Sequence, residues 1–572
     1  MKLTKIISLT LLIVGFSTVA CKDEFLEVLP TGSLSDSQLV TEAGIEGSLI
    51  ATYSILLGRD GQFYNSSDNW FWGSVRGGDA NKGSDSGDQS VVNEVQSYST
   101  QTTNSEVKNK YAYTYEGIAR ANSTLTLLAN AAEDVTDELK LRVEAEVKFL
   151  RGHYYFELKK NYNNTPYIDE TWDGLTDVPN NQDLWPMIES DLEFAYNNLP
   201  ETQTQIGRAN KWAAAAYLGK AYLYQEKYAQ ALTLFNEVIA SGTTPDGTPY
   251  TLIENYADLF YANNDNHAES IFAIQASVNT GSIDNANPAL VLNYPYNGGP
   301  AGCCGFFQPS LELANSYRTE AGLPLLDGDY NSDPLVDDIG VAATDAFTPD
   351  QGTVDPRLDH TVGRRGIPFH DWGIHPGVAW IRLQTYGGPY SSKKWVYRES
   401  DVADGNIDNS SWTSGYTAFN VTIIRFADVL LMAAECEVEV GDLEKARTYV
   451  NMIRERAANS DTWVKLDDGS DAANYAISLY EDAWTSQSDA RAAVRFERKI
   501  ELAMEGQRFY DLVRWGVAEE VLDAYIAHEN GELPTSPFVG ADFKTNQDEY
   551  LPIPQDEIDL LGTDVLQQNT GY

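Results

Sequence analysis

Small and apolar residues recur at steps of three and four between residues 208 and 242, and this pattern limits most what the chain can fold into. The pattern forms two runs on either side of the polar residues 225–227. The first run comprises Ala215, Leu218, Gly219 and Tyr222, and the second comprises Tyr228, Ala231, Phe235 and Val238. A period near 3.6 residues predicts two amphipathic helices joined by a short turn.

The spacing of this pair resembles the tetratricopeptide repeat, in which small residues let two antiparallel helices approach closely. We therefore expect Gly219 and Ala231 to lie where the two helices are nearest. A fainter copy follows farther along the chain, with small or apolar residues at Leu430, Ala433, Ala434, Ala446, Val450 and Ile453. One repeat cannot bury both of its faces, so other helices should complete the stack.

Further helices are predicted at residues 113–131, 137–162 and 184–198. Between about residues 279 and 414 the texture changes, because Gly, Pro, Asn and Asp surround isolated aromatic residues. Loops this long usually belong to a binding surface. We predict a mainly α fold, in which helical hairpins within residues 35–278 and 415–525 pack against an irregular, loop-rich region with short strands at residues 279–414.

The chain has 572 residues, of which 84 are acidic and 40 are basic, and its net charge is −44. That length allows one large architecture or two to four lobes. The electrostatic field of such a negatively charged protein repels phosphate backbones and anionic lipid headgroups. We therefore expect no nucleic-acid partner.

One strongly apolar stretch, residues 6–20, stands near the start of the chain behind Lys2 and Lys5. It is shorter than the about 20 residues that a bilayer crossing needs, and its form is typical of an export signal. Residues 1–20 are therefore predicted to be a signal peptide.

Residues 17–21 resemble the bacterial lipobox, whose cysteine receives diacylglycerol before cleavage. Cys21 is therefore predicted to be the lipidated first residue of a mature chain that spans residues 21–572. Thr18 stands where that pattern usually has Leu, which leaves a plain signal peptide as the alternative. Residues 22–24, Lys-Asp-Glu, resemble the acidic tag of lipoproteins that are displayed on the outer face of the outer membrane. The lipid would then be the only contact with the membrane.

The remaining cysteines are Cys303, Cys304 and Cys436. An export compartment permits disulfides, but three cysteines make no disulfide framework. We expect Cys303 and Cys304 to be two buried thiols in an apolar segment, with a vicinal bridge as the alternative.

Segments spread over nearly the whole chain resemble the SusD/RagB family of outer-membrane glycan-binding lipoproteins. The most specific segment, residues 498–516, reads Arg-x-x-Glu-Leu-x-x-Glu-Gly-x-Arg-x-x-Asp-Leu-x-Arg-Trp-Gly, and Leu-Pro-Ile-Pro follows at residues 551–554. The other matching segments lie at residues 25–30, 146–156, 188–200, 208–214, 257–272, 322–324, 355–357 and 425–435. Tyr111 departs from the pattern, because the family often has Trp there.

The resemblance implies a SusD-like fold, with tetratricopeptide-like helices as a platform and an irregular region that holds the ligand surface. It also implies a non-catalytic lipoprotein of polysaccharide utilisation, which binds an oligosaccharide or another nutrient and delivers it to a SusC-like TonB-dependent transporter. Two alternatives remain open. One is an extracellular glycosidase that uses two of the loop acids, and the other is a tetratricopeptide-type adaptor that grips a segment of another protein.

Acidic residues at positions 497, 501 and 505, in and just before the most specific segment, step by four, which places them on one side of a helix. We expect intramolecular ion pairs here and no catalytic pair of carboxyls. The predicted pairs join Glu497, Glu501 and Glu505 to Arg498, Arg508 and Arg514.

Signatures of enzymes and metal sites are incomplete. Residues 391–394 match S-x-x-K, but the S-D-N at residues 67–69 precedes them and no K-T-G follows. His370 and His375 are near each other in a loop, without a zinc-binding pattern. A calcium-loop spacing, beside the simpler interpretation of a solvated acidic loop, is formed by Asp327, Asp329, Asn331 and Asp338.

A sugar presents C–H groups on one face and hydroxyls at its edges, so its binding site needs flat aromatic rings beside hydrogen-bonding side chains. Two segments offer that mixture: the glycine-rich residues 69–81 and the scattered aromatic residues between 294 and 380. Phe306 and Phe307 are expected to belong to the core. The predicted ligand-binding residues are Trp70, Trp72, Asp79, Asn81, Tyr296 and Trp372.

Overall fold

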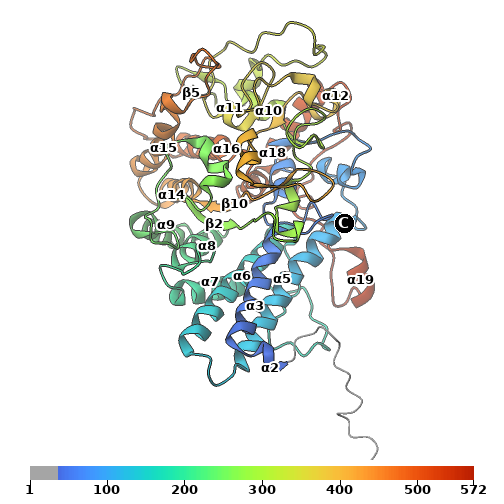
Figure 1. Ribbon diagram of the computed structural model, residues 1–572, viewed down its shortest axis with the longest axis vertical. Helices are drawn as coiled ribbons and strands as arrows, with labels where there is room; N and C mark the ends of the chain where they lie inside the picture. Colours follow the sequence, from blue (N-terminus) through green and yellow to red (C-terminus); the bar gives the residue numbers. More distant parts are fainter. Residues whose placement is uncertain (1–35, 327) are drawn as a thin grey trace, which may run out of the picture.

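The computed structural model describes residues 36–326 and 328–572, so the predicted signal peptide and Cys21 lie outside the described residues. The fold is mainly α, as predicted (Figure 1). Long helices occupy the lower part and the left side of the view in Figure 1, and loops with short elements fill the top. None of the described helices combines the length and the apolar character that a bilayer crossing requires.

The first helices of the chain form a bundle at the bottom of Figure 1. Its members are α2 (Asp36–Leu39), α3 (Glu42–Tyr53), α5 (Ser105–Ala129), α6 (Asp137–Tyr162) and α7 (Trp185–Asn198). α6 has the predicted bounds, because Thr136 caps it by accepting a hydrogen bond from the backbone N–H of Leu139 at 3.2 Å. The positive charges of Lys159 and Lys160 in its last turn interact favourably with the negative end of the helix dipole.

α5 begins earlier than residue 113, where the prediction placed it, because Asn104 caps the helix. The side-chain oxygen of Asn104 accepts from the backbone N–H groups of Glu106 at 2.9 Å and Val107 at 3.1 Å. Tyr111 lies inside this helix and packs edge-on against Tyr162 of α6, with 5.2 Å between the ring centroids. The tyrosine therefore fills a core position at the point where the sequence departs from the family pattern.

Helices α8 (Lys211–Leu223) and α9 (Tyr228–Ser241) form the predicted hairpin. Gly219 lies directly against α9, since a Cβ built on it would be 2.6 Å from Cε1 of Phe235. Ala231 of α9 is fully buried. Small residues therefore let the two helices approach, as the tetratricopeptide-like pattern predicts.

The hairpins stack in chain order along the left side of Figure 1. α7 packs against α8, and α9 packs against α14 (Phe426–Val440). α14 packs in turn against α15 (Leu443–Ala457) and α16 (Gln487–Glu501), so the fainter second repeat is the α14–α15 hairpin. The last helices are α17 (Arg508–Arg514), α18 (Ala518–Glu532) and α19 (Gln555–Leu561).

Residues 279–414 hold only short helices and strands. The α-helices of this segment are α10 (Leu311–Asn315), α11 (Leu358–Thr361), α12 (Gln384–Gly387) and α13 (Glu399–Asp404). A similarly short helix, α4 (Asn93–Gln96), occurs earlier in the chain. Each sheet within the described residues has two antiparallel strands. The pairs are β1 (Ala80–Gly83) with β3 (Phe306–Pro309), β2 (Ser270–Ile274) with β10 (Val421–Arg425), β4 (Thr319–Glu320) with β5 (Leu323–Pro324), β6 (Val362–Gly363) with β7 (Ser391–Ser392), and β8 (Ile407–Asp408) with β9 (Tyr416–Thr417).

Replacing Gly219 by alanine is expected to lower the free energy of unfolding by about 1–2 kcal/mol. The added methyl group meets the buried ring of Phe235, which costs more than the about 1 kcal/mol that alanine gains from its helix propensity. Gly47 in α3 is a matched control, because no heavy atom lies within 4 Å of a Cβ built there. Gly47→Ala should therefore stabilise the protein. Urea unfolding of both variants measures whether each substitution raises or lowers the free energy of unfolding. If both substitutions stabilise the protein, α8 and α9 do not approach each other closely at Gly219.

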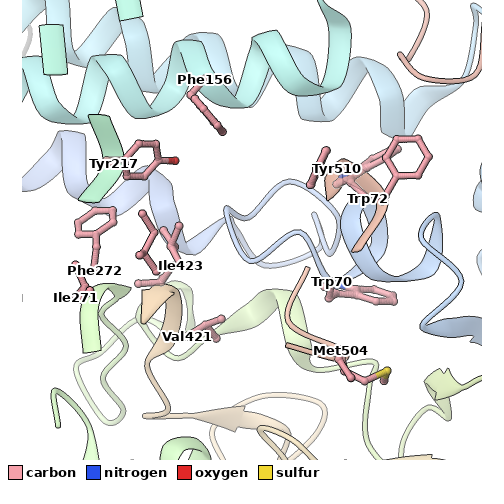
Figure 2. Close-up of a cluster of buried hydrophobic side chains, with 14 of the residues drawn as sticks. Trp70, Trp72, Phe156, Tyr217, Ile271, Phe272, Val421, Ile423, Met504 and Tyr510 are labelled. Carbon is pink, nitrogen blue, oxygen red and sulfur yellow. The ribbon is translucent and has the colours of Figure 1, made fainter. Parts of the chain in front are cut away.

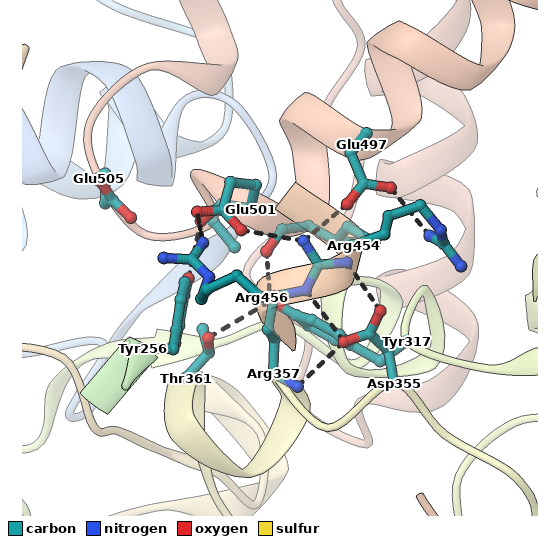
Figure 3. Close-up of polar contacts among 12 residues, drawn as sticks. Tyr256, Tyr317, Asp355, Arg357, Thr361, Arg454, Arg456, Glu497, Glu501 and Glu505 are labelled. Carbon is teal, nitrogen blue, oxygen red and sulfur yellow. Dashed lines mark hydrogen bonds and ion pairs between the residues drawn. The ribbon is translucent and has the colours of Figure 1, made fainter. Parts of the chain in front are cut away.

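A buried set of ion pairs joins the loop-rich region to the helices (Figure 3). Oε2 of Glu501, at the end of α16, accepts from Nη1 of Arg357 at 2.9 Å. Its Oε1 accepts from Nη1 of Arg425 at 2.7 Å and from Nη2 of Arg456 at 2.5 Å. These side chains are at most 4% exposed, so one carboxylate on α16 binds arginines from three distant segments.

Glu497, one turn earlier on α16, extends the same set. Its Oε1 accepts from Nη1 of Arg357 at 2.7 Å, and its Oε2 accepts from Nη1 of Arg454 at 2.9 Å. Asp355 binds the remaining side of Arg357, with 2.7 Å between Oδ2 and Nη2. Arg357 of the loop-rich region is therefore surrounded by three carboxylates.

The predicted ion pairs are structural, but their predicted partners are wrong. Glu497 and Glu501 face the loop-rich region, whereas Arg498 points to another side of α16 and pairs with Asp428 at 2.8 Å. Glu505 pairs with Lys394 and Arg425, and Arg514 pairs with Glu435 and Asp511. The helix breaks after Glu501, so the four-residue spacing no longer determines which side chains meet beyond that point.

Candidate functional site

A polar pocket of about 770 Å³ opens between the end of α3, the middle of α5 and the short 3-10 helix η7 (Ile283–Asn285). Its lining is rich in groups that donate or accept hydrogen bonds, as a sugar with many hydroxyls requires. These groups include Arg59, Asp60, Gln62, Asn109, Asp284 and Asn285. We call this site the polar pocket.

Local hydrogen bonds fix the walls of the polar pocket. The chain leaves the helical region at Gly58, whose φ of +77° favours glycine. Tyr113 of α5 donates from its hydroxyl to the carbonyl of Gly58 at 2.9 Å. The backbone N–H of Asp60 donates to Oδ1 of Asp284 at 2.8 Å, which ties the segment to η7. The pocket is therefore held by contacts between segments that are far apart in the sequence.

Trp412 provides an exposed ring beside the polar pocket. It lies in the seven-residue loop between β8 and β9, and 55% of its surface is accessible. Its ring meets the edge of Tyr416, with 6.4 Å between centroids. The hydroxyl of Tyr416 donates to Oδ1 of Asp60 on the pocket wall. Burial and this carboxylate raise the pKa of Tyr416 to about 12, so the phenol keeps its proton and remains the donor.

Contacts link the Trp412 loop to Trp372. Thr413 donates from Oγ1 to the carbonyl of Ala301 at 3.4 Å, and the backbone N–H of Ala301 donates to the hydroxyl of Tyr397 at 2.6 Å. Nε1 of Trp372 donates to the carbonyl of Tyr397 at 2.8 Å. Trp372 is partly exposed, so its role as a ligand-binding residue stays a prediction.

Tyr296 is the second predicted residue that is partly exposed. Its backbone N–H donates to the carbonyl of Trp380 at 2.8 Å. The guanidinium carbon of Arg382 lies 5.3 Å from the centroid of the Tyr296 ring, and Arg382 also pairs with Asp85 and Asp88. Tyr296 therefore offers a ring beside charged groups that form hydrogen bonds.

Trp70 and Trp72 lie in the core and do not face a ligand surface (Figure 2). They are 2% and 0% exposed. Both belong to the π-helical turn η3 (Trp70–Val75), and their indole nitrogens donate to the carbonyls of Phe63 and Tyr64, respectively. We therefore leave both tryptophans out of the candidate site.

Asp79 and Asn81 are also buried, each 1% exposed. Oδ2 of Asp79 accepts from the backbone N–H of Met504 at 3.0 Å, and burial raises the pKa of Asp79 to about 6. Nδ2 of Asn81 donates to Oε2 of Glu529 at 2.9 Å, and its Oδ1 accepts from the hydroxyl of Tyr525 at 2.8 Å. These side chains hold β1 against the C-terminal part of the chain and are unavailable to a ligand in this structure.

Two family models match the chain. One, described as starch-binding and associating with the outer membrane, matches residues 24–223. The other describes the SusD family and matches residues 268–572, which is more than half of the 572 residues. The chain belongs to the SusD family.

Known relatives and solved structures extend this match over the whole fold. A SusD-like protein of Formosa agariphila is 26% identical over 546 residues, which cover 91% of this chain and 92% of that protein. A SusD superfamily protein from Bacteroides vulgatus has a TM-score of 0.68 and 22% identity, covering 93% of this chain and 99% of that one. Surface glycan-binding protein A from Bacteroides thetaiotaomicron, solved in complex with laminarihexaose, has a TM-score of 0.64 and 21% identity, covering 92% and 99%. These structural likenesses show the shared SusD fold.

Two parts of the candidate site were not indicated by the sequence of this SusD-family chain: Trp412 and the polar residues of the pocket. Trp412 stands alone in the polar run of residues 409–415, so no neighbouring aromatic residue marked it. Its place inside the predicted loop-rich region was the one available signal. Asp60 and Asp284 are 224 residues apart, and nothing local in the sequence joins them.

Cys303 and Cys304 form a vicinal disulfide, so the expectation of two thiols is wrong. The apolar neighbours Phe306 and Phe307 suggested a core position for the whole segment. Both phenylalanines are 1% exposed and belong to the core, as predicted, whereas Cys303 is only partly buried at the end of the preceding loop. Cys436 is a free, buried cysteine of α14.

No group of three or more His, Cys, Asp or Glu side chains within residues 36–326 and 328–572 is arranged to hold a metal ion. Of the residues with calcium-loop spacing, Asp327 lies outside the described residues. Asn331 accepts a hydrogen bond from Asn315 at 3.1 Å, and Asp338 lies 3.5 Å from Arg365. Because Asp327 is not described, calcium binding at these residues stays a prediction.

Proposed function

We propose that this SusD-family protein is a non-catalytic, lipid-anchored glycan-binding protein of the cell surface. In this proposal the polar pocket and Trp412 capture an oligosaccharide, which a SusC-like TonB-dependent transporter of the outer membrane then receives. The observation that carries the proposal is the exposed indole of Trp412 beside a pocket rich in Asn, Asp, Gln and Arg. An aromatic face packs against the C–H groups of a sugar, and the polar groups bind its hydroxyls.

The structural relatives support an oligosaccharide as the ligand. Surface glycan-binding protein A was solved with laminarihexaose, and another neighbour is named a laminarin-binding SusD-like protein. Both have the fold of this chain, so the same scaffold holds glycans in other proteins. Binding of a glycan array by the purified protein, with no product released on prolonged incubation, is the expected result. Cleavage of the bound glycan would instead favour the glycosidase.

The membrane anchor and the transporter are separate parts of the proposal. The match to a model named for association with the outer membrane supports the location, and the predicted anchor is Cys21. Cys21→Ala should abolish incorporation of labelled fatty acid and release the protein from membranes. Affinity purification from the native outer membrane should recover a large β-barrel partner with the wild-type protein.

Trp412→Ala is expected to weaken glycan binding at least tenfold, because it removes the exposed stacking surface next to the polar pocket. Trp172→Ala is the matched control, since Trp172 is also well exposed, at 46%, but does not line the polar pocket. Isothermal titration with a glycan identified on the array measures both affinities. Equal affinities for wild type and Trp412→Ala contradict the site, whereas a wild type that binds no glycan contradicts the proposed function.

A further inference from the structure

A second pocket, of about 420 Å³, lies among α10, α16, α17 and α18 and shares no lining residue with the polar pocket. We call it the arginine pocket, because Arg495 and Arg508 line it. Its volume suits a small ligand. Much of its wall is aromatic or aliphatic, formed by Tyr330, Phe496, Leu512, Trp515, Val521 and Tyr525.

Arg495 has an unsatisfied donor in this pocket. Its Nε is shielded from solvent and has no hydrogen-bond partner within the described part of the chain. Its guanidinium carbon lies 4.7 Å from the centroid of the Trp515 ring, and Arg514 lies 4.9 Å from the same centroid. Arg514 is neutralised by Glu435, but Arg495 forms no ion pair with a described residue. A buried donor without an acceptor is costly, so the site is suited to receive one.

Arg508 is the second guanidinium without a partner. Its side chain forms no ion pair or hydrogen bond with the residues that the structure describes. The nearby Lys499 is already occupied, because its Nζ binds Glu312 at 2.6 Å and the hydroxyl of Tyr330 at 2.9 Å. The other acid of the lining, Glu520, is exposed. Arg495 and Arg508 thus line the pocket without an ion pair to a described carboxylate, and Glu435 and Glu312 act on them only at longer range.

We propose that the arginine pocket binds a carboxylated sugar, such as a uronic acid. A guanidinium presents planar, paired N–H donors that match a carboxylate in a bidentate fashion. The aromatic and aliphatic walls suit the C–H faces of a sugar ring and strengthen the charge-assisted hydrogen bonds by excluding water. This binding does not depend on the polar pocket, so a free uronate occupies the arginine pocket whether or not the polar pocket binds a neutral glycan.

Ligand specificity gives the first test, because it leaves the protein unchanged. Isothermal titration of the purified protein compares galacturonate with galactose, and glucuronate with glucose. The uronate should bind at least tenfold more tightly than its neutral parent, and its affinity should fall as salt is added. Acetate tests the carboxylate without the ring and should bind more weakly than either uronate. The proposal is overturned if a uronate and its parent sugar bind with equal affinity, or if neither uronate binds measurably.

Substitutions locate the binding. Arg495→Gln and Arg508→Gln should each weaken uronate binding at least tenfold, and the double variant should abolish it. Arg491→Gln is the matched control on the same helix, because Arg491 pairs with Glu439 at 2.6 Å and does not line the pocket; it should leave the affinity unchanged. Circular dichroism checks the fold, and Arg495→Gln carries the test if Arg508→Gln does not fold. Uronate binding that survives Arg495→Gln, or that is lost in Trp412→Ala, contradicts the assignment.

Discussion

Replacing Arg357 by methionine is expected to lower the free energy of unfolding by about 3–5 kcal/mol, which is a large share of the stability of a typical protein. Arg357 is fully buried and binds the carboxylates of Asp355, Glu497 and Glu501. Burial alone would raise the pKa of Glu501, but Arg456, Arg425 and Arg357 together hold that pKa well below its usual range. The carboxylate therefore stays ionised when one of its partners is lost, and the variant buries uncompensated charge.

Lys465→Met is the control for the loss of a cation. Lys465 pairs with Asp471 at the surface, where both side chains are more than a third exposed. Removing an exposed ion pair changes stability by no more than about 1 kcal/mol. Chemical unfolding followed by circular dichroism compares the two variants. A loss below about 1 kcal/mol for Arg357→Met would mean that the buried ion pairs do not hold the loop-rich region to the helices.

Replacing Trp72 by alanine is expected to lower the free energy of unfolding by about 3–5 kcal/mol. Its ring is fully buried, packs edge-on against Phe71 at 5.4 Å between centroids, and donates a hydrogen bond to the carbonyl of Tyr64. The substitution leaves a cavity in the core, which relaxes only partially, and an unpaired carbonyl.

The same change at Trp412 separates a core tryptophan from a surface one. Trp412→Ala should leave the free energy of unfolding within about 1 kcal/mol of the wild type, because the ring is largely in solvent. Folded molecules of Trp72→Ala should keep the glycan affinity of the wild type, so the amount of bound glycan should fall only by the fraction of the variant that is unfolded. If Trp72→Ala remains as stable as the wild type but binds glycan more weakly, the buried position of this ring is not the one the protein adopts in solution.

The helices were predictable because their sequence carries its own period. Small residues at Gly219 and Ala231 and the cap at Thr136 are local signals, and each acts within a turn or two of the helix that it shapes. The start of α5 was missed because the residues between Asn104 and Tyr111 are polar except for Val107, so they show no apolar period. Local sequence signals were sufficient to predict that the helices exist, but they were less reliable for predicting where each helix begins and ends.

The site was less predictable because exposure in an aperiodic segment depends on distant parts of the chain. Glycines beside Trp70 and Trp72 resembled those of an open loop, yet Gly73 is small because the backbone of Gly506 lies against it: a Cβ there would be 1.9 Å from the carbonyl oxygen. Tyr416 and Asp60, which place Trp412 at the polar pocket, are 356 residues apart. No pattern within either segment indicates that contact.

The short pairing of β8 with β9 closes the Trp412 loop at its base, apart from the buried ion pairs of α16. Ile407 faces Thr417 and Asp408 faces Tyr416 at the base of the hairpin, and none of the buried ion pairs of α16 involves residues 409–415. Thr413 and Gly415 at the end of this loop are buried, and a Cβ built on Gly415 would be 2.9 Å from the ring of Tyr294, so only residues 409–412 can vary without disturbing the packing. If Trp412 binds sugars as proposed, changes at these four exposed or partly exposed positions would alter the sugar preference while the rest of the polypeptide keeps its architecture.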